Sequence, residues 1–164
     1  MKVAENPLLR PYIGNPAILD SNLLLLRWCV EFDPSLVVTF KRLNSFQFED
    51  VELLSETLKI FSNVRTTPHV LTEISNLANQ LPSWIKDDWH VHFSSQIQAI
   101  PEEWIPASTI ASGDLMWLGL TDAALGILAR THVILTIDFP LSNSLESRGL
   151  NVINFTHLRS LWLE

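Results

Sequence analysis

The stretch from Gly119 to Pro140 constrains the fold of this chain more than any other. Its first half is rich in Ala, Leu and Ile and predicts a short, deeply packed helix that opens at Thr121 or Asp122. Its second half contains the apolar run Val133–Leu135, which predicts a buried strand ending at Asp138. One carboxylate is therefore expected at the start of a buried helix and another at the carboxyl end of a buried strand, where open α/β sheets bind ligands.

The same order of strand, acid and helix occurs near the start of the chain. Ala17–Leu19 predicts a strand that ends at Asp20, and the apolar residues of 23–30 predict the helix that follows it. Thr67 and Pro68 form a typical helix start, with Thr as the cap and Pro in the first turn.

The remaining segments continue the alternation of helices and strands. Helices are expected over 49–61, 68–78, 84–100, 111–117 and 141–148, strands over 63–67 and 152–155, and a turn or helix over 157–163, while 36–46 stays ambiguous. This order predicts an α/β fold, a three-layer α/β/α sandwich with a central, mainly parallel sheet. Residues 1–15 are expected to form a turn-rich N-terminal lead-in, and residues 16–164 a single domain.

Charge and composition exclude several classes of protein. Eighteen acidic and eleven basic residues give a net charge of −7, which argues against a broad basic surface for duplex nucleic acid. A nucleic-acid enzyme stays possible where metal ions supply positive charge locally. The single cysteine, Cys29, excludes an intramolecular disulfide. The first residues do not resemble a signal peptide, and no apolar run is long enough for a membrane span, so we expect a soluble cytoplasmic protein with no membrane association.

Four acids stand in apolar surroundings, where a lone carboxylate is costly: Asp20, Glu73, Asp122 and Asp138. Taken singly, Asp122 is typical of a helix cap, Asp20 and Asp138 of turns after strands, and Glu73 of a helix surface. Taken together, they predict a cleft in which like charges repel unless a cation or a proton is bound. Ligands that are all oxygen favour Mg²⁺ or Mn²⁺, and such an ion is suited to phosphodiester hydrolysis.

Four segments resemble, in order, the four motifs of PIN domains. They are Ile18-Leu-Asp-Ser-Asn-Leu-Leu-Leu, Thr67-Pro-His-Val-Leu-Thr-Glu-Ile-Ser-Asn, Gly119-Leu-Thr-Asp-Ala-Ala-Leu and Leu135-Thr-Ile-Asp-Phe-Pro-Leu. Each segment alone is a weak signal, but their common order and spacing over about residues 16–155 make a strong one.

The resemblance implies a three-layer α/β/α fold and a metal-dependent endoribonuclease that acts on single-stranded or structured RNA. It assigns the motif acids to Asp20, Glu73, Asp122 and Asp138, which would bind one or two Mg²⁺ or Mn²⁺ ions, with Asp138 acting directly or through water. It also implies that Ser21, Asn22 or Thr136 tunes the site through hydrogen bonds. Many bacterial members are toxins blocked by an antitoxin and are often dimeric, so an antitoxin partner and a homodimer are further expectations.

Two other functions stay open from the sequence. One is a catalytically silent PIN-like module that binds or scaffolds in RNA processing, and the other is a structure-specific DNA nuclease. Lys41, Arg42 and Arg65 are weak candidates for holding the substrate backbone, because isolated charges are more often merely solvated.

Several further residues have competing interpretations. Asp114 is a candidate outer acid of the site. His90 and His92 are expected within a helix, where residues two apart point in different directions. Trp84, Trp89 and Trp104 suit base stacking or a partner interface, although core packing is the favoured interpretation.

Overall fold

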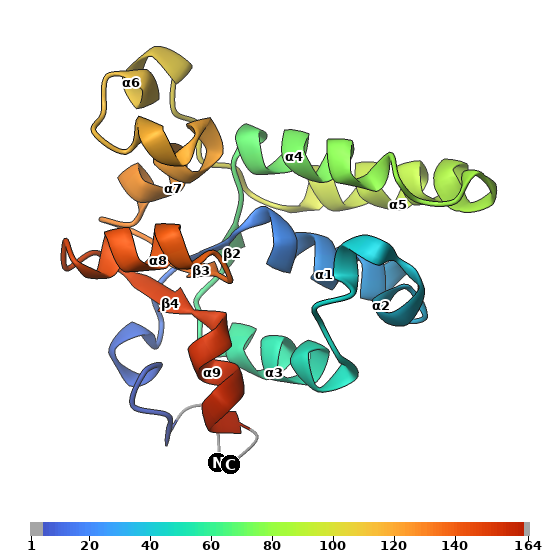
Figure 1. The fold of residues 1–164 in the computed structure, drawn as a ribbon, viewed down its shortest axis with the longest axis horizontal. Helices are drawn as coiled ribbons and strands as arrows, with labels where there is room; N and C mark the ends of the chain where they lie inside the picture. The colour runs from blue at the N-terminus through green and yellow to red at the C-terminus, as the bar shows by residue number, and fades with distance from the viewer. Residues whose placement is uncertain (1–4, 163–164) are drawn as a thin grey trace.

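A four-stranded parallel sheet forms the centre of the molecule. The computed structural model describes residues 5–162. Its strands are β1 (Ala17–Leu19), β2 (Val64–Arg65), β3 (Val133–Thr136) and β4 (Val152–Asn154), in the order β2-β1-β3-β4 (Figure 1). All neighbouring strands run parallel, as the alternation of helices and strands predicts.

The helices cover both sides of this sheet. They are α1 (Ser21–Phe32), α2 (Leu36–Thr39), α3 (Phe48–Leu58), α4 (Pro68–Ala78), α5 (Lys86–Ala99), α6 (Ala107–Ala111), α7 (Leu120–Leu128), α8 (Phe139–Glu146) and α9 (Phe155–Trp162). Short 3₁₀ turns are η2 (Arg10–Tyr12), η3 (Lys41–Leu43), η4 (Ser83–Ile85) and η5 (Met116–Leu118). In Figure 1, α4, α5 and α7 lie on one side of the strands and α3 and α9 on the other, while α1 contacts α3, α4 and α5. The predicted α/β class with helical layers around a parallel sheet is confirmed.

The strands are mostly apolar because helices cover both faces of the sheet. Every residue of β1, β3 and β4 is buried, as is typical of a parallel sheet between helical layers. β2 is shorter than the predicted strand over 63–67. After Arg65 its partner changes, since Thr66 N–H donates to the carbonyl of Pro101 and the carbonyl of Thr66 accepts from Glu103.

Two helix starts follow the sequence closely. The Thr67 hydroxyl accepts a hydrogen bond from Val70 N–H at 3.2 Å, with Pro68 as the first residue of α4, so this predicted start is confirmed. Asp20 caps α1 in the same manner through Leu23 N–H. Because of this cap, α1 begins at Ser21, earlier than predicted.

The predictions for the organising stretch are partly wrong at its boundaries. α7 begins at Leu120, and its cap is Gly119 with a φ of 98°, so neither Thr121 nor Asp122 caps it; Asp122 lies in its first turn. β3 ends at Thr136 rather than Asp138. Asp138 instead caps α8, which begins earlier than predicted, because its carboxylate accepts from Leu141 N–H at 2.7 Å.

The middle of the chain departs furthest from prediction. The expected helix over 84–100 is divided into η4 and α5, and Ser83 makes no capping hydrogen bond. The expected helix over 111–117 is wrong, because α6 ends at Ala111 and the chain turns before η5. Leu115 holds this turn against α7, since a Cβ atom at Gly126 would lie 2.3 Å from Leu115 Cδ1. Only a glycine allows this approach with Leu115 in its present position.

The remaining predicted elements exist with small shifts in their bounds. The ambiguous stretch 36–46 forms α2 and η3, and the predicted helices over 49–61 and 141–148 correspond to α3 and α8. The predicted strand over 152–155 corresponds to β4, and the expected turn or helix over 157–163 to α9, with Leu163 outside the described residues.

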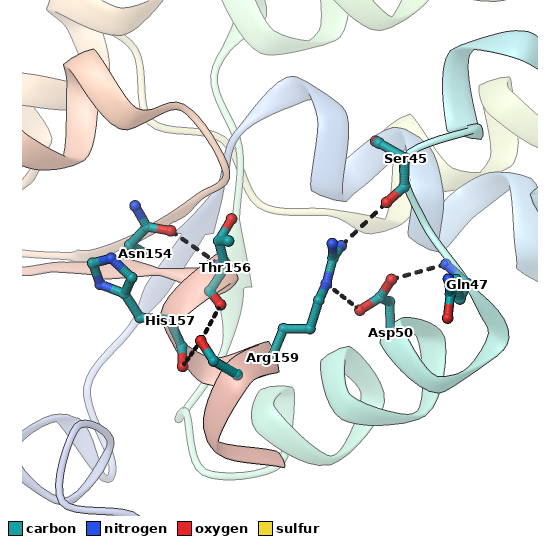
Figure 2. Close-up of polar contacts among 8 residues, drawn as sticks. Ser45, Gln47, Asp50, Asn154, Thr156, His157 and Arg159 are labelled. Atoms are coloured by element: carbon teal, nitrogen blue, oxygen red, sulfur yellow. Dashed lines mark hydrogen bonds and ion pairs between the residues drawn. The ribbon is translucent and has the colours of Figure 1, made fainter. Parts of the chain in front are cut away.

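The C-terminal helix is attached to the body by polar contacts (Figure 2). Arg159 Nε lies 2.6 Å from Asp50 Oδ1 in an ion pair, and the other oxygen of this buried carboxylate accepts from Gln47 N–H. Asn154 accepts from Thr156 N–H at the start of α9. The ion pair connects α9 to α3 on the side of the sheet away from α7, and the Asn154 contact connects α9 to β4 (Figure 1).

The described part of the lead-in packs on the body. Leu9 is fully buried in the core, and Gly14 N–H donates to the carbonyl of Ile60. Residues 1–4 lie outside the described part of the chain. The division into a lead-in and one domain over 16–164 stays a prediction. Between residues 5 and 162, none of the helices combines the length and apolar character needed to cross a bilayer.

Candidate active site

Three of the four predicted acids lie where helices begin at or near the carboxyl edge of the sheet, and the fourth, Glu73, lies in the middle of α4. Asp20 caps α1 directly after β1, Asp138 caps α8 shortly after β3, and Asp122 lies in the first turn of α7. Glu73 projects from α4, the helix that follows β2. Because β1 and β3 are paired with Leu19 beside Leu135, Asp20 meets Thr136 at this edge. The N-terminal ends of these helices carry partial positive charge, which favours carboxylates at the caps and in the first turns.

Asp20 is the most tightly held of the four acids. Its Oδ1 atom accepts from Leu23 N–H at 2.8 Å, and its Oδ2 atom accepts from the Thr136 hydroxyl at 2.5 Å and from Ile137 N–H at 2.9 Å. The side chain is buried, and this burial raises the pKa of Asp20 above its ordinary value, although the three hydrogen bonds act in the opposite direction. The carboxylate is therefore fixed in one orientation.

Glu73 is bound to the start of α1 through Ser21. The Ser21 hydroxyl donates a hydrogen bond to Glu73 Oε2 at 2.5 Å. Because Ser21 directly follows Asp20, this bond connects the segment of Asp20 to the helix that carries Glu73. Glu73 itself is exposed at the edge of the cluster. Asn22, the third residue expected to tune the site, is exposed and makes no side-chain hydrogen bond among residues 5–162.

Thr136 connects Asp20 to the segment that carries Asp138. Its hydroxyl donates to Asp20 and accepts from the backbone N–H of Asp138 at 2.9 Å. Asp138 Oδ1 is occupied by Leu141 N–H at the start of α8. Thr136 thus fixes the orientation of one acid and the backbone position of another.

The pKa of Asp122 indicates that the negative charges of the other three acids act on its carboxyl group. Its pKa is raised to about 7, first by burial and then by the negative charges of Asp138, Glu73 and Asp20. The fold therefore brings the four acids close enough for their charges to oppose the ionisation of Asp122. Asp114 is not among these charges. It lies exposed and pairs with Arg148 at 2.7 Å, which lowers the pKa of Asp114.

The donor set suits a hard divalent cation, although the side chains do not form a coordination site as they stand. Among residues 5–162, no group of three or more His, Cys, Asp or Glu side chains is arranged to hold a metal ion. Asp122 makes no side-chain hydrogen bond in this part of the chain, and Glu73 keeps one oxygen without a protein donor. A site with excess negative charge and uncommitted carboxylate oxygens fits Mg²⁺ or Mn²⁺ in its chemistry.

The predicted substrate-binding cations are engaged elsewhere or lie on other elements. Arg65 on β2 forms an ion pair with Glu103 at 2.6 Å, and Arg42 Nε donates to Gln80 Oε1. Lys41 is exposed in η3. None of the three contacts one of the four acids among the interactions of the described residues. Their role in substrate binding stays a prediction.

The tryptophans divide between the core and the surface. Trp89 is fully buried and stacks on Phe93, so the prediction of core packing is confirmed for it. The same prediction is wrong for Trp84 and Trp104, which are exposed. His90 and His92 lie in α5 as predicted, and His92 Nε2 contacts the carbonyl of Trp28.

The four acids differ in exposure: Asp20 is buried, Asp122 and Asp138 are half-buried, and Glu73 is exposed. A hollow of about 430 Å³ lies between α1 and α3 and is lined by Leu26, Val51 and Leu54 among others, away from the four carboxylates.

Sequence reasoning missed the backbone donors that hold Asp20 and Asp138. Leu23, Ile137 and Leu141 act through their N–H groups, which carry no signal in their side chains. Asp20 and Asp138 were interpreted as turn residues after strands rather than as helix caps, so the sequence analysis did not anticipate these donors.

Comparison with known proteins adds no further assignment: no family model, no curated protein and no solved structure matches this chain.

Proposed function

We propose that this chain is a metal-dependent endoribonuclease that hydrolyses RNA phosphodiester bonds at the edge carrying Asp20, Glu73, Asp122 and Asp138. The observation that carries the proposal is the convergence of the acids, since Thr136 connects Asp20 to Asp138 and Ser21, next to Asp20, donates to Glu73. The raised pKa of Asp122, to which the other three carboxylates contribute, supports it. A protein keeps such a costly cluster where a bound cation compensates for the repulsion. The resemblance of the four segments to PIN motifs supplies the reaction class.

Each acid has a distinct part in this proposal. Asp20, held by three donors, provides a carboxylate of fixed orientation, and Asp138 provides a second one at the start of α8. Glu73 and Asp122 provide the less constrained carboxylates that complete the binding of one or two ions. When bound, Mg²⁺ or Mn²⁺ lowers the pKa of water and neutralises charge that develops on the phosphodiester.

The proposal requires no side-chain nucleophile. The four acids would bind the ions. Ser21 and Thr136 keep the carboxylates of Glu73 and Asp20 in one orientation through their hydrogen bonds. A homodimer and an antitoxin partner follow from the resemblance alone, and a cytoplasmic location is an expectation from the sequence; all three remain further parts of the proposal.

The test is cleavage of a single-stranded RNA, and of DNA of the same sequence, with Mg²⁺, with Mn²⁺ and with a chelator. We expect metal-dependent cleavage of RNA that falls about 100-fold or more in Asp20→Asn and in Asp122→Asn. Asp114→Asn is the matched control, because this acid is exposed and paired with Arg148, and it should cleave as the wild type does. Circular dichroism checks that each variant is folded.

Three outcomes would contradict the proposal. Cleavage that is equal in all variants would place the activity outside the acidic cluster. Preference for DNA would favour the DNA nuclease. A wild type that cleaves neither polymer and binds no divalent ion would favour the binding or scaffolding module.

A further inference from the structure

The hollow of about 430 Å³ between α1 and α3, here called the α1–α3 hollow, lies beside β2, the edge strand of the sheet. Its apolar lining comes from all three elements and consists of Leu26, Val30, Val51, Leu54, Leu58 and Val64. Leu26 and Leu54 are buried and the other four are half-buried, so the lining is a continuation of the core. The volume falls within the range of roughly 300–1,000 Å³ that is typical of small-molecule sites. The hollow is therefore suited in size and polarity to the body of a small organic ligand.

The polar residues of the hollow lie on the same two helices. Arg27 pairs with Glu31 along α1, at 2.9 Å between Nε and Oε1, and Lys59, which follows α3, pairs with Glu56. Each pair joins neighbours on one helix and is at least a third exposed, so it is held only weakly. A small number of polar groups around an apolar lining is the usual composition of a ligand site, where the polar groups fix the orientation of the ligand.

Arg27 has hydrogen-bonding capacity that the protein does not use. Its Nε atom donates to Glu31, whereas its Nη1 and Nη2 atoms donate to no acceptor in the described part of the chain. Arg27 and Val64 also line a second hollow of about 230 Å³, next to Gln96 and Ile100, so the Arg27 side chain lies between two depressions. Two uncommitted guanidinium nitrogens match the two oxygens of a carboxylate or a phosphate.

The charges nearby favour a carboxylate over a phosphate. Glu31 and Glu56 remain close to the cations with which they pair, and the whole chain has a net charge of −7. A phosphate monoester, with nearly two negative charges at neutral pH, would be repelled more strongly by these groups than a carboxylate with one. The ligand that fits best therefore has an aliphatic body and a single carboxylate.

We propose that the α1–α3 hollow binds a small amphipathic carboxylate. The aliphatic body packs on Leu54, Leu58 and the other apolar lining residues, and the carboxylate pairs with the Nη atoms of Arg27. This site is independent of the proposed nuclease function, because none of the four acids lines the hollow.

The test uses octanoate, with octanol as an uncharged ligand of the same chain length, and measures their affinities by calorimetry. Arg27→Met removes the guanidinium group and keeps an apolar stem, so it should weaken octanoate binding about tenfold and leave octanol binding unchanged. The wild type should accordingly bind octanoate more tightly than octanol. Arg10→Met is the matched control, because Arg10 is exposed in η2 and does not line the hollow.

A second variant tests the hollow by filling it. Ser55 is an exposed residue of α3 that lines the hollow, and Ser55→Trp should abolish the binding of both octanoate and octanol by occupying their space. Ser94→Trp is the matched control, because Ser94 is exposed in the middle of α5 and is absent from the lining. Circular dichroism checks that all four variants are folded.

Four results would overturn the inference. Octanoate that binds Ser55→Trp and Ser94→Trp equally would place its site elsewhere. Equal losses of octanoate and octanol affinity in Arg27→Met would show that the guanidinium group does not bind the carboxylate. A wild type that binds neither ligand would leave the hollow without this function. If such a wild type were a dimer that Ser55→Trp dissociates, the hollow would be a contact between two copies.

The failure of this inference and the failure of the proposed nuclease are distinguishable. The binding measurements contain no RNA and no divalent cation, so their outcome does not depend on Asp20, Glu73, Asp122 or Asp138. Loss of RNA cleavage in the variants of those acids would in turn leave octanoate binding unchanged.

Discussion

Thr136 donates its hydroxyl proton to Asp20 across 2.5 Å between two neighbouring strands, and the same oxygen accepts the N–H of Asp138. One fully buried hydroxyl thus serves two of the four acids. Its position follows from the parallel register, which sets the ends of β1 and β3 side by side. The arrangement makes the geometry of the acidic edge depend on a residue with no charge.

Replacing Thr136 with Val keeps the shape of the side chain and removes both hydrogen bonds. The buried carboxylate of Asp20 and the N–H of Asp138 each lose a partner, which should reduce the free energy of unfolding by about 1–3 kcal/mol. Urea unfolding followed by circular dichroism measures the change at a pH where the carboxylates are ionised.

Thr57→Val is the matched control for this substitution. Thr57 is also fully buried, but its hydroxyl has no hydrogen-bond partner among the described residues. Val at this position should leave stability unchanged or raise it, because no partner is lost. If the two substitutions reduced the free energy of unfolding equally, the hydrogen bond between Thr136 and Asp20 would not be the cause of the loss.

Substitutions of the neighbouring residues Ser21 and Asn22 compare a residue that positions an acid with one that does not. Ser21→Ala removes the only hydrogen bond to the Glu73 carboxylate among the described residues, and we expect RNA cleavage to fall about tenfold, as for other residues that orient metal-binding groups. Asn22→Ala should cleave at the wild-type rate, since its exposed side chain bonds to none of the acids. The metal concentration for half-maximal activity should rise only in Ser21→Ala. A loss in Asn22→Ala alone would contradict this assignment.

The fold was predictable wherever local pattern and tertiary structure agree. The buried strands β1 and β3 were visible as apolar runs, and the start of α4 was visible as Thr67 followed by Pro68. The sequence also indicated that Asp20 and Asp138 lie past strand ends, although Asp138 proved to be a helix cap two residues beyond its strand.

Long-range and backbone effects set the limit of that prediction. The cap of α7 is Gly119 because a left-handed backbone turn from η5 leads into the helix, and residue preferences at Thr121 and Asp122 do not reveal this. The bond between Ser21 and Glu73 joins residues 52 apart in the chain. The exposure of Trp104 could not be predicted either, because helical periodicity gives no information about the burial of residues in a loop.

The raised pKa of Asp122 predicts how stability without metal depends on pH. Between its ordinary value of 3.8 and about 7, the folded protein holds a proton that the unfolded chain has lost, so increasing pH favours unfolding over this range. In the presence of a chelator, the Tm of the wild type should therefore fall more steeply from about pH 4 to 7 than that of Asp122→Asn. The difference between the two Tm curves isolates this group, because the other titrating groups are common to both proteins. Parallel curves would contradict the raised pKa.

Calorimetric titration of Mn²⁺ near pH 7, in two buffers of different ionisation enthalpy, tests the central claim that the four acids form one cation site. We predict that the wild type binds Mn²⁺ and releases protons, since the pKa of Asp122 lies near 7 and a bound cation favours its ionised form. Asp122→Asn should bind more weakly and release fewer protons, while Asp114→Asn should match the wild type. A wild type that binds no Mn²⁺, or binds it with the affinity and proton release of Asp122→Asn, would contradict the account.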